Sequence, residues 1–451
     1  MRARRVNATK AAGLIIRATR GLLFTHDIFP PPFTGEVSVA FALANAGRRR
    51  AHLLHAVRKR GPTLLYAATM KNARQTKQKI VVAMSGGVDS SVTAALLKRA
   101  DYDVIGITLR LYGSQAKRKG ACCAGADIYD ARRVAELLGI PHYVLNYEER
   151  FRSRVIADFA ETYARGETPI PCVRCNERVK FADLMETARD LGADALATGH
   201  YVRRLDGPNG PELHASLDPS RDQSYFLFAT TREQLAFLRF PLGGMEKSQV
   251  RAIARDLSLE VAQKPDSQDI CFVRDGDYAR VVAHEKPDAI SAGEIVDENG
   301  RVLGHHPGVV HFTVGQRKGL GLKGNTEPRF VLALDAETRR VTVGPRAALA
   351  VNAITLRDVN WLDALPPPTG QGLGGGRTRE LAVPVIDCAV KVRSMRPAVP
   401  ARVTPLEGRA AFVDFASPEQ AVAPGQVCVF YSGSRILGGG WIAKSEARTA
   451  A

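Results

Sequence analysis

The chain has 451 residues, a length that exceeds one compact core and predicts two to three domains. Hydrophobic residues make up 45% and charged residues 24%, as in an ordinary globular protein. No stretch approaches about 18 uninterrupted apolar residues, so the sequence predicts no transmembrane helix and no membrane partner. The formal net charge of +17 suggests a polyanionic partner, although many proteins without one are as basic.

The positive charge is concentrated in the first part of the chain. Residues 1–70 contain 12 Lys and Arg against only Asp27 and Glu36. This Arg-rich, acid-poor composition is typical of a transit peptide. The alternative is that translation starts at Met70, because a short polar stretch follows Met70 and runs directly into the first expected strand. We therefore expect residues 1–77 to be a basic extension, disordered or not translated, that takes no part in the fold.

The seven cysteines do not have the spacing of a small disulfide-rich domain. An odd count in a long chain without a convincing secretion signal favours a reducing, cytoplasmic compartment. In that compartment, clustered cysteines more often serve chemistry or metal binding than structure. Cys122 and Cys123 follow a basic stretch and are expected to lie in a solvated loop near RNA. The others are Cys172, Cys175, Cys271, Cys388 and Cys428.

Strand and helix patterns alternate in the first half of the chain. Short apolar runs are typical of buried strands, and apolar residues at helical spacing mark the helices between them. This alternation predicts βαβ units and a parallel sheet covered on both faces, with ligands beyond the carboxyl ends of the strands. The expected strands are 80–84, 104–111, 142–146 and 195–198, and the expected helices are 89–99, 128–138, 149–165 and 176–191.

The pattern changes to short β-rich runs after about residue 285. Asn299-Gly300 between two apolar runs is a strong hairpin signal, and the later runs predict a small barrel or sandwich. A Pro-rich and Gly-rich stretch at 366–376 is typical of a loop or linker. We expect domains at 78–285, 286–350 and 351–445. The expected strands are 294–296, 301–303, 330–334, 340–343, 385–392, 410–415 and 426–431.

Residues 85–91 read Ser-Gly-Gly-Val-Asp-Ser-Ser, between the first expected strand and helix. Two glycines let the backbone turn sharply and present N–H groups to an anion, and the helix N-terminus adds a positive dipole. The hydroxyls of Ser85, Ser90 and Ser91 can donate to phosphate oxygens. The pattern resembles the pyrophosphatase loop of enzymes that split ATP between its α and β phosphates. The plainer alternative is a glycine turn with Asp89 at the start of a helix.

Cys175 and Cys271 are a widely separated pair. Cys175 immediately precedes the helix expected near Asn176, whose N-terminus would lower the pKa of the thiol, as would Arg174 and Arg178. A lone cysteine is ordinarily a small buried hydrophobic residue. This pair therefore indicates a function only through the sequence motifs that surround it.

Those motifs resemble the tRNA-specific 2-thiouridylases in content and order, from about residue 78 to 443. The resemblance implies an α/β N-terminal domain of the adenine-nucleotide α-hydrolase kind with a parallel sheet, then a small central domain, then a C-terminal β-barrel that binds tRNA. The motifs are NERVKF at 176–181, ATGHY at 197–201, RDQSYFL at 221–227, GQRKGLG at 315–321 and PGQ at 424–426.

The resemblance also implies a role for individual residues. Cys175 would be the nucleophile, and Cys271 would carry the incoming sulfur as a persulfide. The implied ATP contacts are Ala83, Met84, Ser85, Gly86, Gly87, Val88, Asp89, Ser90, Leu109 and Gly199. The implied contacts with tRNA are Ile170, Pro171 and Cys172 at the target base, with His200, Arg221, Asp222, Gln223, Arg393, Ser394 and Gln426.

The implied reaction is ATP-dependent 2-thiolation of the wobble uridine of tRNA. ATP with Mg²⁺ would adenylate the 2-carbonyl, persulfide sulfur would displace AMP, and the second cysteine would close a disulfide to release the product. A sulfur-donor protein is the implied partner besides tRNA. Some family members have Asp where this chain has Cys172, and three thiols leave an iron–sulfur cluster on Cys172, Cys175 and Cys271 as an alternative.

Two other functions compete with thiolation. A ligase or amidotransferase with the same loop would need a glutaminase domain or an ammonia route, and it leaves Cys175 and Cys271 without a role. A non-catalytic RNA-binding protein would explain the β-rich half of the chain but not the loop at 85–91.

Overall fold

The computed structural model describes residues 77–112, 125–266, 269–273, 276–322, 327–362 and 384–446. Several stretches singled out in the sequence lie outside the described residues. They are the basic extension up to residue 76, the Cys122-Cys123 pair and the stretch at 366–376.

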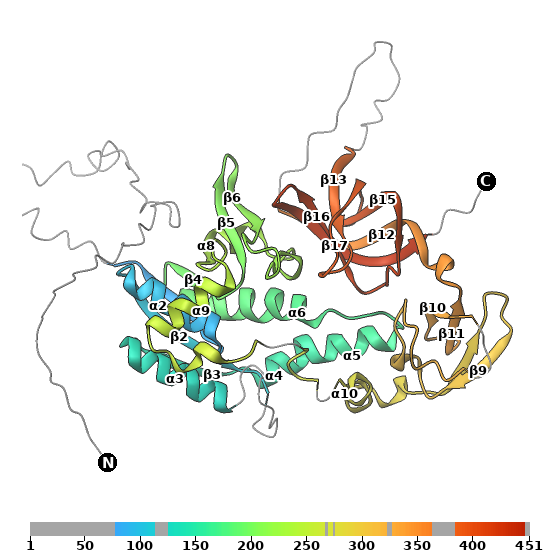
Figure 1. Ribbon diagram of the computed structural model, residues 1–451, viewed down its shortest axis with the longest axis horizontal. Helices are drawn as coiled ribbons and strands as arrows, with labels where there is room; N and C mark the ends of the chain where they lie inside the picture. The colour runs from blue at the N-terminus through green and yellow to red at the C-terminus, as the bar shows by residue number, and fades with distance from the viewer. Residues whose placement is uncertain are drawn as a thin grey trace, which may run out of the picture. The chain divides into compact units, whose positions relative to one another are not determined.

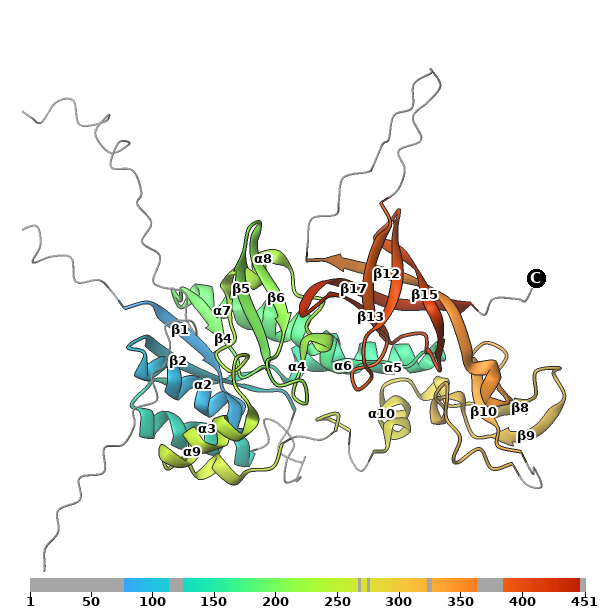
Figure 2. The ribbon, with the colours of Figure 1, turned by 45° about the horizontal axis from the view of Figure 1, so that its top comes forward.

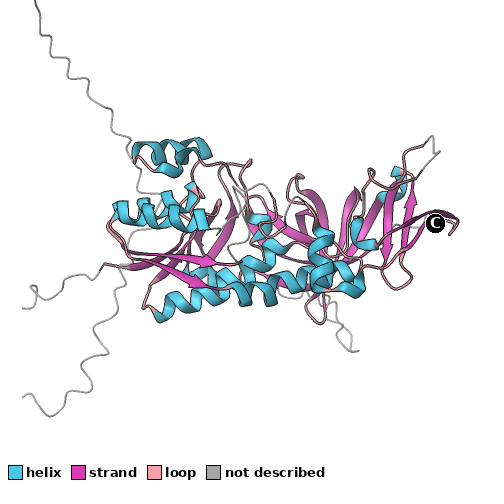
Figure 3. Ribbon diagram, turned by 90° about the horizontal axis from the view of Figure 1, so that it is seen from below, coloured by secondary structure: helices cyan, strands magenta, loops and turns pink. Residues whose placement is uncertain are grey.

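A five-stranded parallel sheet forms the first part of the fold (Figure 1). Its strand order is β3-β2-β1-β4-β7. Val81 and Val82 are adjacent in the central strand and point to opposite faces, yet both are fully buried. Helices accordingly lie on both sides of these strands (Figure 3). The strands are β1 (Lys79–Ala83), β2 (Asp103–Arg110), β3 (His142–Asn146), β4 (Ala195–Ala197) and β7 (Leu238–Arg239).

The helices that follow the first strands agree with the apolar spacing in the sequence. Val92 and Ala95 are fully buried on the helix after β1, and Ala131 and Val134 are buried on the helix after β2. These helices are α2 (Val88–Arg99) and α3 (Gly125–Leu138), and α9 (Lys247–Asp256) packs beside α2. No helix within the described ranges is long and apolar enough to cross a membrane.

Two longer helices contain π-helical segments. The first runs through α4 (Glu148–Phe151), η3 (Arg152–Ile156) and α5 (Ala157–Ala164), as the single helix expected at 149–165. The second runs through α6 (Pro171–Arg174), η4 (Cys175–Asp183) and α7 (Leu184–Asp190). Its start near Asn176 was predicted wrongly: the helix begins at Pro171, because proline lacks the N–H that a first helical residue leaves unbonded.

A small four-stranded sheet follows the α/β part, in the order β10-β11-β8-β9. Val331, Val341 and Val343 are fully buried in its core, beside Ile295. The strands are β8 (Gly293–Val296), β9 (Val302–His306), β10 (Phe330–Asp335) and β11 (Arg340–Gly344), and α10 (Tyr278–Glu285) precedes them.

The last six strands form a closed antiparallel barrel (Figure 2). Their order is β12-β15-β14-β13-β16-β17, and the pairing of β12 with β17 closes the ring. The predicted fold class, an α/β domain with a parallel sheet followed by a small central domain and a C-terminal barrel, is therefore confirmed. The strands are β12 (Ala350–Trp361), β13 (Ile386–Lys391), β14 (Val399–Leu406), β15 (Ala410–Gln420), β16 (Val427–Ser432) and β17 (Arg435–Glu446).

Strand β16 joins the barrel to the α/β part because both of its faces are buried. Cys428 and Phe430 point into the barrel core. Val427, Val429 and Tyr431 point the other way, into the apolar core that also contains residues of the parallel sheet. A hairpin of β5 (Val202–Gly207) and β6 (Gly210–Ala215) extends the barrel sheet beyond β17. The barrel and the α/β part thus share one core.

Glycine permits the close approach at this junction. A Cβ atom on Gly439 would lie 2.7 Å from the carbonyl oxygen of Cys428 and 2.8 Å from Cδ2 of Phe228. The first neighbour belongs to the barrel and the second to the segment between β6 and α8 (Arg232–Phe237). Gly439 thus lets β17 lie against both.

We therefore expect Gly439→Ala to destabilise the protein by about 1–3 kcal/mol, because the added methyl group overpacks the junction. The midpoint of urea unfolding measures the effect. Gly244→Ala is the matched control, since a Cβ there meets no described atom within 4 Å. An unchanged midpoint for Gly439→Ala would show that β17 can shift to make room.

Candidate active site

A cavity of about 690 Å³ opens beyond the carboxyl ends of the central strands. Its walls come from the loop after β1, the end of β2, the start of α6, the segment after β4 and residues 264–266 and 269–272. The cavity therefore brings together stretches that are far apart in the sequence.

The loop between β1 and α2 forms one end of the cavity. Gly86 has a φ of 74°, and a Cβ atom there would lie 2.0 Å from the carbonyl oxygen of Asp127. A Cβ atom on Gly199 would lie 2.9 Å from the backbone nitrogen of Ser90. Both positions therefore require glycine for close packing. Ser91 departs from the expectation: its hydroxyl is fully buried and donates to the carbonyl oxygen of Gly87 at 2.8 Å, not toward the cavity.

The predicted ATP-contact residues lie mostly on the cavity wall. Those that line it are Ala83, Met84, Ser85, Gly87, Val88, Asp89, Ser90, Leu109 and Gly199, while Gly86 lies within the same loop.

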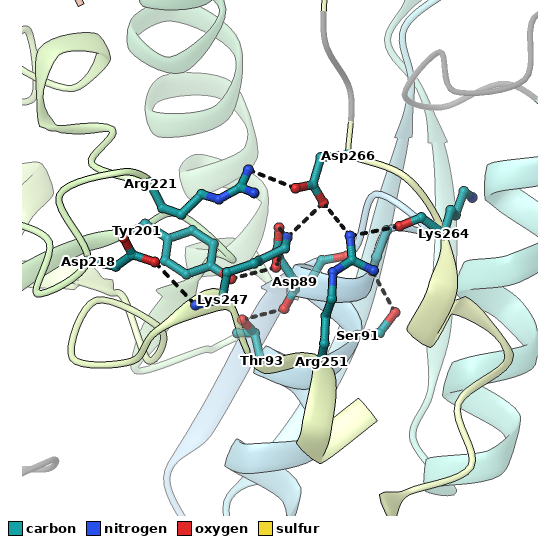
Figure 4. A network of polar contacts seen from close by, with 12 residues as sticks. Asp89, Ser91, Thr93, Tyr201, Asp218, Arg221, Lys247, Arg251, Lys264 and Asp266 are labelled. Carbon is teal, nitrogen blue, oxygen red and sulfur yellow. Dashed lines mark hydrogen bonds and ion pairs between the residues drawn. The ribbon is translucent and has the colours of Figure 1, made fainter. Parts of the chain in front are cut away.

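Asp89 belongs to a network of charged side chains around the buried Lys247 (Figure 4). The Nζ atom of Lys247 lies 2.8 Å from both carboxylate oxygens of Asp89 and 2.8 Å from Oδ1 of Asp266. The hydroxyl of Tyr201 donates to Oδ1 of Asp89 at 2.8 Å. Burial, together with the negative charge of Asp89, raises the pKa of Tyr201, so this phenol remains a hydrogen-bond donor.

Sequence reasoning did not identify Lys247, Lys264 or Asp266. Lys264 donates to the carbonyl oxygen of Gly86 at 2.9 Å and pairs with Asp127 and Asp130. Burial alone would lower the pKa of Lys264, but the hydrogen bonds and charges of the two aspartates outweigh it and raise that pKa. Single lysines on amphipathic helices or in loops carry no sequence signal for such pairing.

All three cysteines of the predicted site line the same cavity. Cys172 is exposed near the start of α6, Cys175 is buried at the start of η4, and Cys271 is partly buried. The described residues contain no group of three or more His, Cys, Asp or Glu side chains that could hold a metal ion. The three thiols therefore do not fit a cluster, and the iron–sulfur alternative is not supported.

The expected electrostatic surroundings of Cys175 need correction. Because the helix begins at Pro171, Cys175 lies past its first turn and away from the unpaired N–H groups. Arg174 instead packs 3.8 Å from the ring of Trp441 and pairs with Glu177. Arg178 pairs with Asp158 at 2.9 Å. Both guanidinium groups therefore have carboxylate partners.

Six of the predicted tRNA contacts line the cavity, namely Ile170, Pro171, Cys172, His200, Arg221 and Gln223. His200 is bonded to the hydroxyl of Thr198 at 2.7 Å. Burial, with the nearby positive charge of Lys180, holds the pKa of His200 well below its usual range, so the imidazole is neutral.

The remaining predicted tRNA contacts have other surroundings. Asp222 accepts hydrogen bonds from the backbone and hydroxyl of Ser224. Arg393 and Ser394 follow β13, and Gln426 precedes β16, so these three belong to the barrel. The Nε of Arg393 and the Oε1 of Gln426 are buried without a hydrogen-bond partner in the described structure.

Comparison with known proteins assigns each part of the chain to a domain family. Residues 78–275 match the tRNA methyl transferase HUP domain, and residues 281–345 match the tRNA methyl transferase PRC-barrel domain. Residues 351–442 match the aminomethyltransferase beta-barrel domain.

Whole proteins are similar over most of the chain. The tRNA-specific 2-thiouridylase MnmA of Rhodospirillum centenum is 58% identical over 381 residues, which cover 82% of this chain and 93% of that protein. Its counterpart in Parvibaculum lavamentivorans is 58% identical, with 83% and 92% covered. The counterpart in Roseobacter denitrificans is 54% identical, with 85% and 98% covered. The chain therefore belongs to the family of tRNA-specific 2-thiouridylases.

Proposed function

We propose that this protein is an ATP-dependent tRNA-uridine 2-sulfurtransferase that thiolates the wobble uridine. The observation that carries the proposal is that Cys175 and Cys271, 96 residues apart, line one cavity together with the loop at 85–90. A nucleotide on the loop and sulfur on a cysteine can therefore meet at one base. Mass spectrometry of nucleosides from tRNA incubated with the protein, ATP and a sulfur source tests the proposal by the appearance of 2-thiouridine.

The reaction divides into three steps. The O2 atom of uridine attacks the α-phosphorus of ATP, supplied with Mg²⁺, and pyrophosphate leaves. The terminal sulfur of a Cys271 persulfide attacks C2, and AMP leaves with the former O2. The Cys175 thiolate then attacks Sγ of Cys271. The S–S bond breaks, its electron pair goes to the sulfur on C2, and a Cys175–Cys271 disulfide forms. A thiol reductant restores the two cysteines.

The cavity suits this sequence of reactions chemically. The glycine loop and the start of α2 offer N–H groups to phosphates. Ile170 and Pro171 give an apolar edge, and a neutral His200 can bind a base edge without attracting a phosphate. The uridine must leave its stack to reach between the cysteines. We assign the ATP and base contacts accordingly, with a sulfur-donor protein as partner and the cytoplasm as the reducing compartment.

We further propose that the catalytic domain spans 78–285, the central domain 286–350 and the tRNA-binding barrel 351–445. The match of residues 351–442 to a β-barrel domain, and the position of Arg393, Ser394 and Gln426 beside its strands β13 and β16, support this division.

The loop should be required for pyrophosphate release. We expect the Asp89→Ala protein to release no pyrophosphate from ATP when tRNA is added, because the substitution removes the carboxylate that holds Lys247 beside the loop. Gly87→Ala is a milder variant, since its Cβ would meet only Ser85 Oγ at 3.5 Å, and it should keep the fold while crowding the phosphates. Circular dichroism checks the fold of both. Undiminished pyrophosphate release in both variants contradicts a role for this loop.

Substitution of Cys271 and substitution of Cys175 should block different steps of the thiolation reaction. We expect Cys271→Ser to lose the protein-bound persulfide, whereas Cys175→Ser should accept sulfur but produce no thiolated tRNA. Persulfide mapping by mass spectrometry, with nucleoside analysis, separates the two. Cys388→Ser is the control, because burial raises the pKa of Cys388 to about 12 and keeps it a thiol. Thiolation at the wild-type rate by either active-cysteine variant refutes this scheme.

The barrel should contribute to tRNA affinity. We expect Arg393→Ala to weaken tRNA binding and to flatten its dependence on salt, because a phosphate-contacting arginine releases counterions on binding. Arg402→Ala is the control, since Arg402 is an exposed arginine on the same barrel that pairs with Asp414. Affinities measured at several salt concentrations decide the matter. Equal losses in both variants would point to general charge instead of a contact at Arg393.

A further inference from the structure

The segment before Cys271 contacts the loop between β1 and α2, and the start of α2, at two points. Lys264 donates to the carbonyl oxygen of Gly86 and pairs with Asp127 and Asp130 on α3. Two residues later, Asp266 shares the ammonium group of Lys247 with Asp89 (Figure 4). Cys271 follows Asp266 by only five residues, which span at most about 18 Å. The position of Asp266 therefore limits where the sulfur of Cys271 can lie.

Asp266 is also the point where three cations meet. Its carboxylate lies 2.8 Å from Lys247, 2.9 Å from Arg221 and 3.2 Å from Arg251. The Asp266 side chain is 19% exposed and that of Lys247 only 9%. Burial alone would raise the pKa of Asp266, but the hydrogen bond from Lys247 and the surrounding positive charges outweigh it and lower that pKa. The carboxylate therefore remains ionised at neutral pH.

Each end of this network faces a different substrate of the proposed reaction. Lys247 lines the cavity beside the loop, so the polyphosphate of ATP competes with Asp89 and Asp266 for its ammonium group. Arg221 lines the cavity on the side assigned to tRNA, so an RNA phosphate competes with Asp266 for its guanidinium group. Lys247 is buried, and a buried charge is costly without partners, so a change at this ammonium group must be balanced at Asp266 or Asp89.

We propose that Asp266 is a positioning residue that couples the binding of ATP and tRNA to the placement of Cys271 for sulfur transfer. Both substrates draw cations away from this carboxylate and so shift the segment that carries the persulfide. Adenylation should continue without Asp266, because both carboxylate oxygens of Asp89 still hold Lys247 beside the loop at 2.8 Å. This inference depends on the proposed function and assigns it an additional residue.

The test compares Asp266→Asn with wild type in the full-length protein. Cys271 is first loaded with polysulfide, a source of sulfane sulfur, and excess reagent is removed. Pyrophosphate release on addition of ATP and tRNA reports adenylation, and a single turnover of 2-thiouridine formation reports sulfur transfer. Iodoacetamide labelling of unloaded Cys271, mapped by mass spectrometry with and without α,β-methylene ATP, reports the placement of the thiol.

We expect Asp266→Asn to keep pyrophosphate release near the wild-type rate and to slow sulfur transfer about tenfold or more. The nucleotide should change the labelling rate of Cys271 in wild type but not in the variant. Glu260→Gln is the matched control, since it removes a carboxylate that pairs with Arg133 just upstream of the same segment, and it should match wild type. Asp266→Glu, which keeps the charge, should give intermediate values and substitutes for the Asn variant if that variant does not fold.

Each of three outcomes would contradict the proposed coupling or the proposed function. Sulfur transfer and nucleotide-dependent labelling at wild-type levels in Asp266→Asn refute the coupling. Loss of pyrophosphate release together with sulfur transfer shows that Asp266 serves ATP binding instead. If wild type itself forms no 2-thiouridine, while tRNA triggers no pyrophosphate release, the proposed function is wrong and not merely the coupling.

Discussion

The ammonium group of Lys247 is the charge on which the arrangement of the cavity depends. A buried cation must have ionised partners, and here they are Asp89 from the loop and Asp266 from the segment before Cys271. Because the hydrogen bonds are short and Lys247 is buried, these three residues fix one another. The start of α2, the start of α9 and the segment at 264–266 are thereby held at one place, although they are distant in the sequence.

A second constraint is the apolar core that the barrel shares with the parallel sheet. Strand β16 supplies alternate side chains to two cores, so removal of the barrel would expose to water the α/β side chains that Val427, Val429 and Tyr431 cover. Additional polar contacts cross the same junction, such as the hydroxyl of Tyr225 donating to the carbonyl oxygens of Val392 and Val427 at 3.1 Å each. Single substitutions on the barrel therefore test its role more cleanly than truncation.

Local signals in the sequence predicted the parallel sheet and the residues of the loop. They left either a barrel or a sandwich open for the C-terminal part, and they gave no indication of the network around the loop. Apolar periodicity predicts β1 and α2, and the glycines at 86 and 87 mark the turn between them. Strands β12 and β17, each 12 residues long, were missed, because bulges break their alternation and β17 contains three consecutive glycines. The pairing of Lys247 with Asp89 depends on tertiary contact across 158 residues, which no local pattern records.

Cys271 lies between two anchors of different physical character. Upstream, Asp266 is held by charges that a nucleotide or an RNA phosphate can compete for. Downstream, the ring of Phe272 packs edge-on against Phe151 and Phe159, with centroids 5.7 and 5.2 Å apart, and apolar packing of this kind does not respond to an incoming anion. In the proposed coupling, a substrate therefore shifts the Asp266 end of this segment, while the end at Phe272 stays packed.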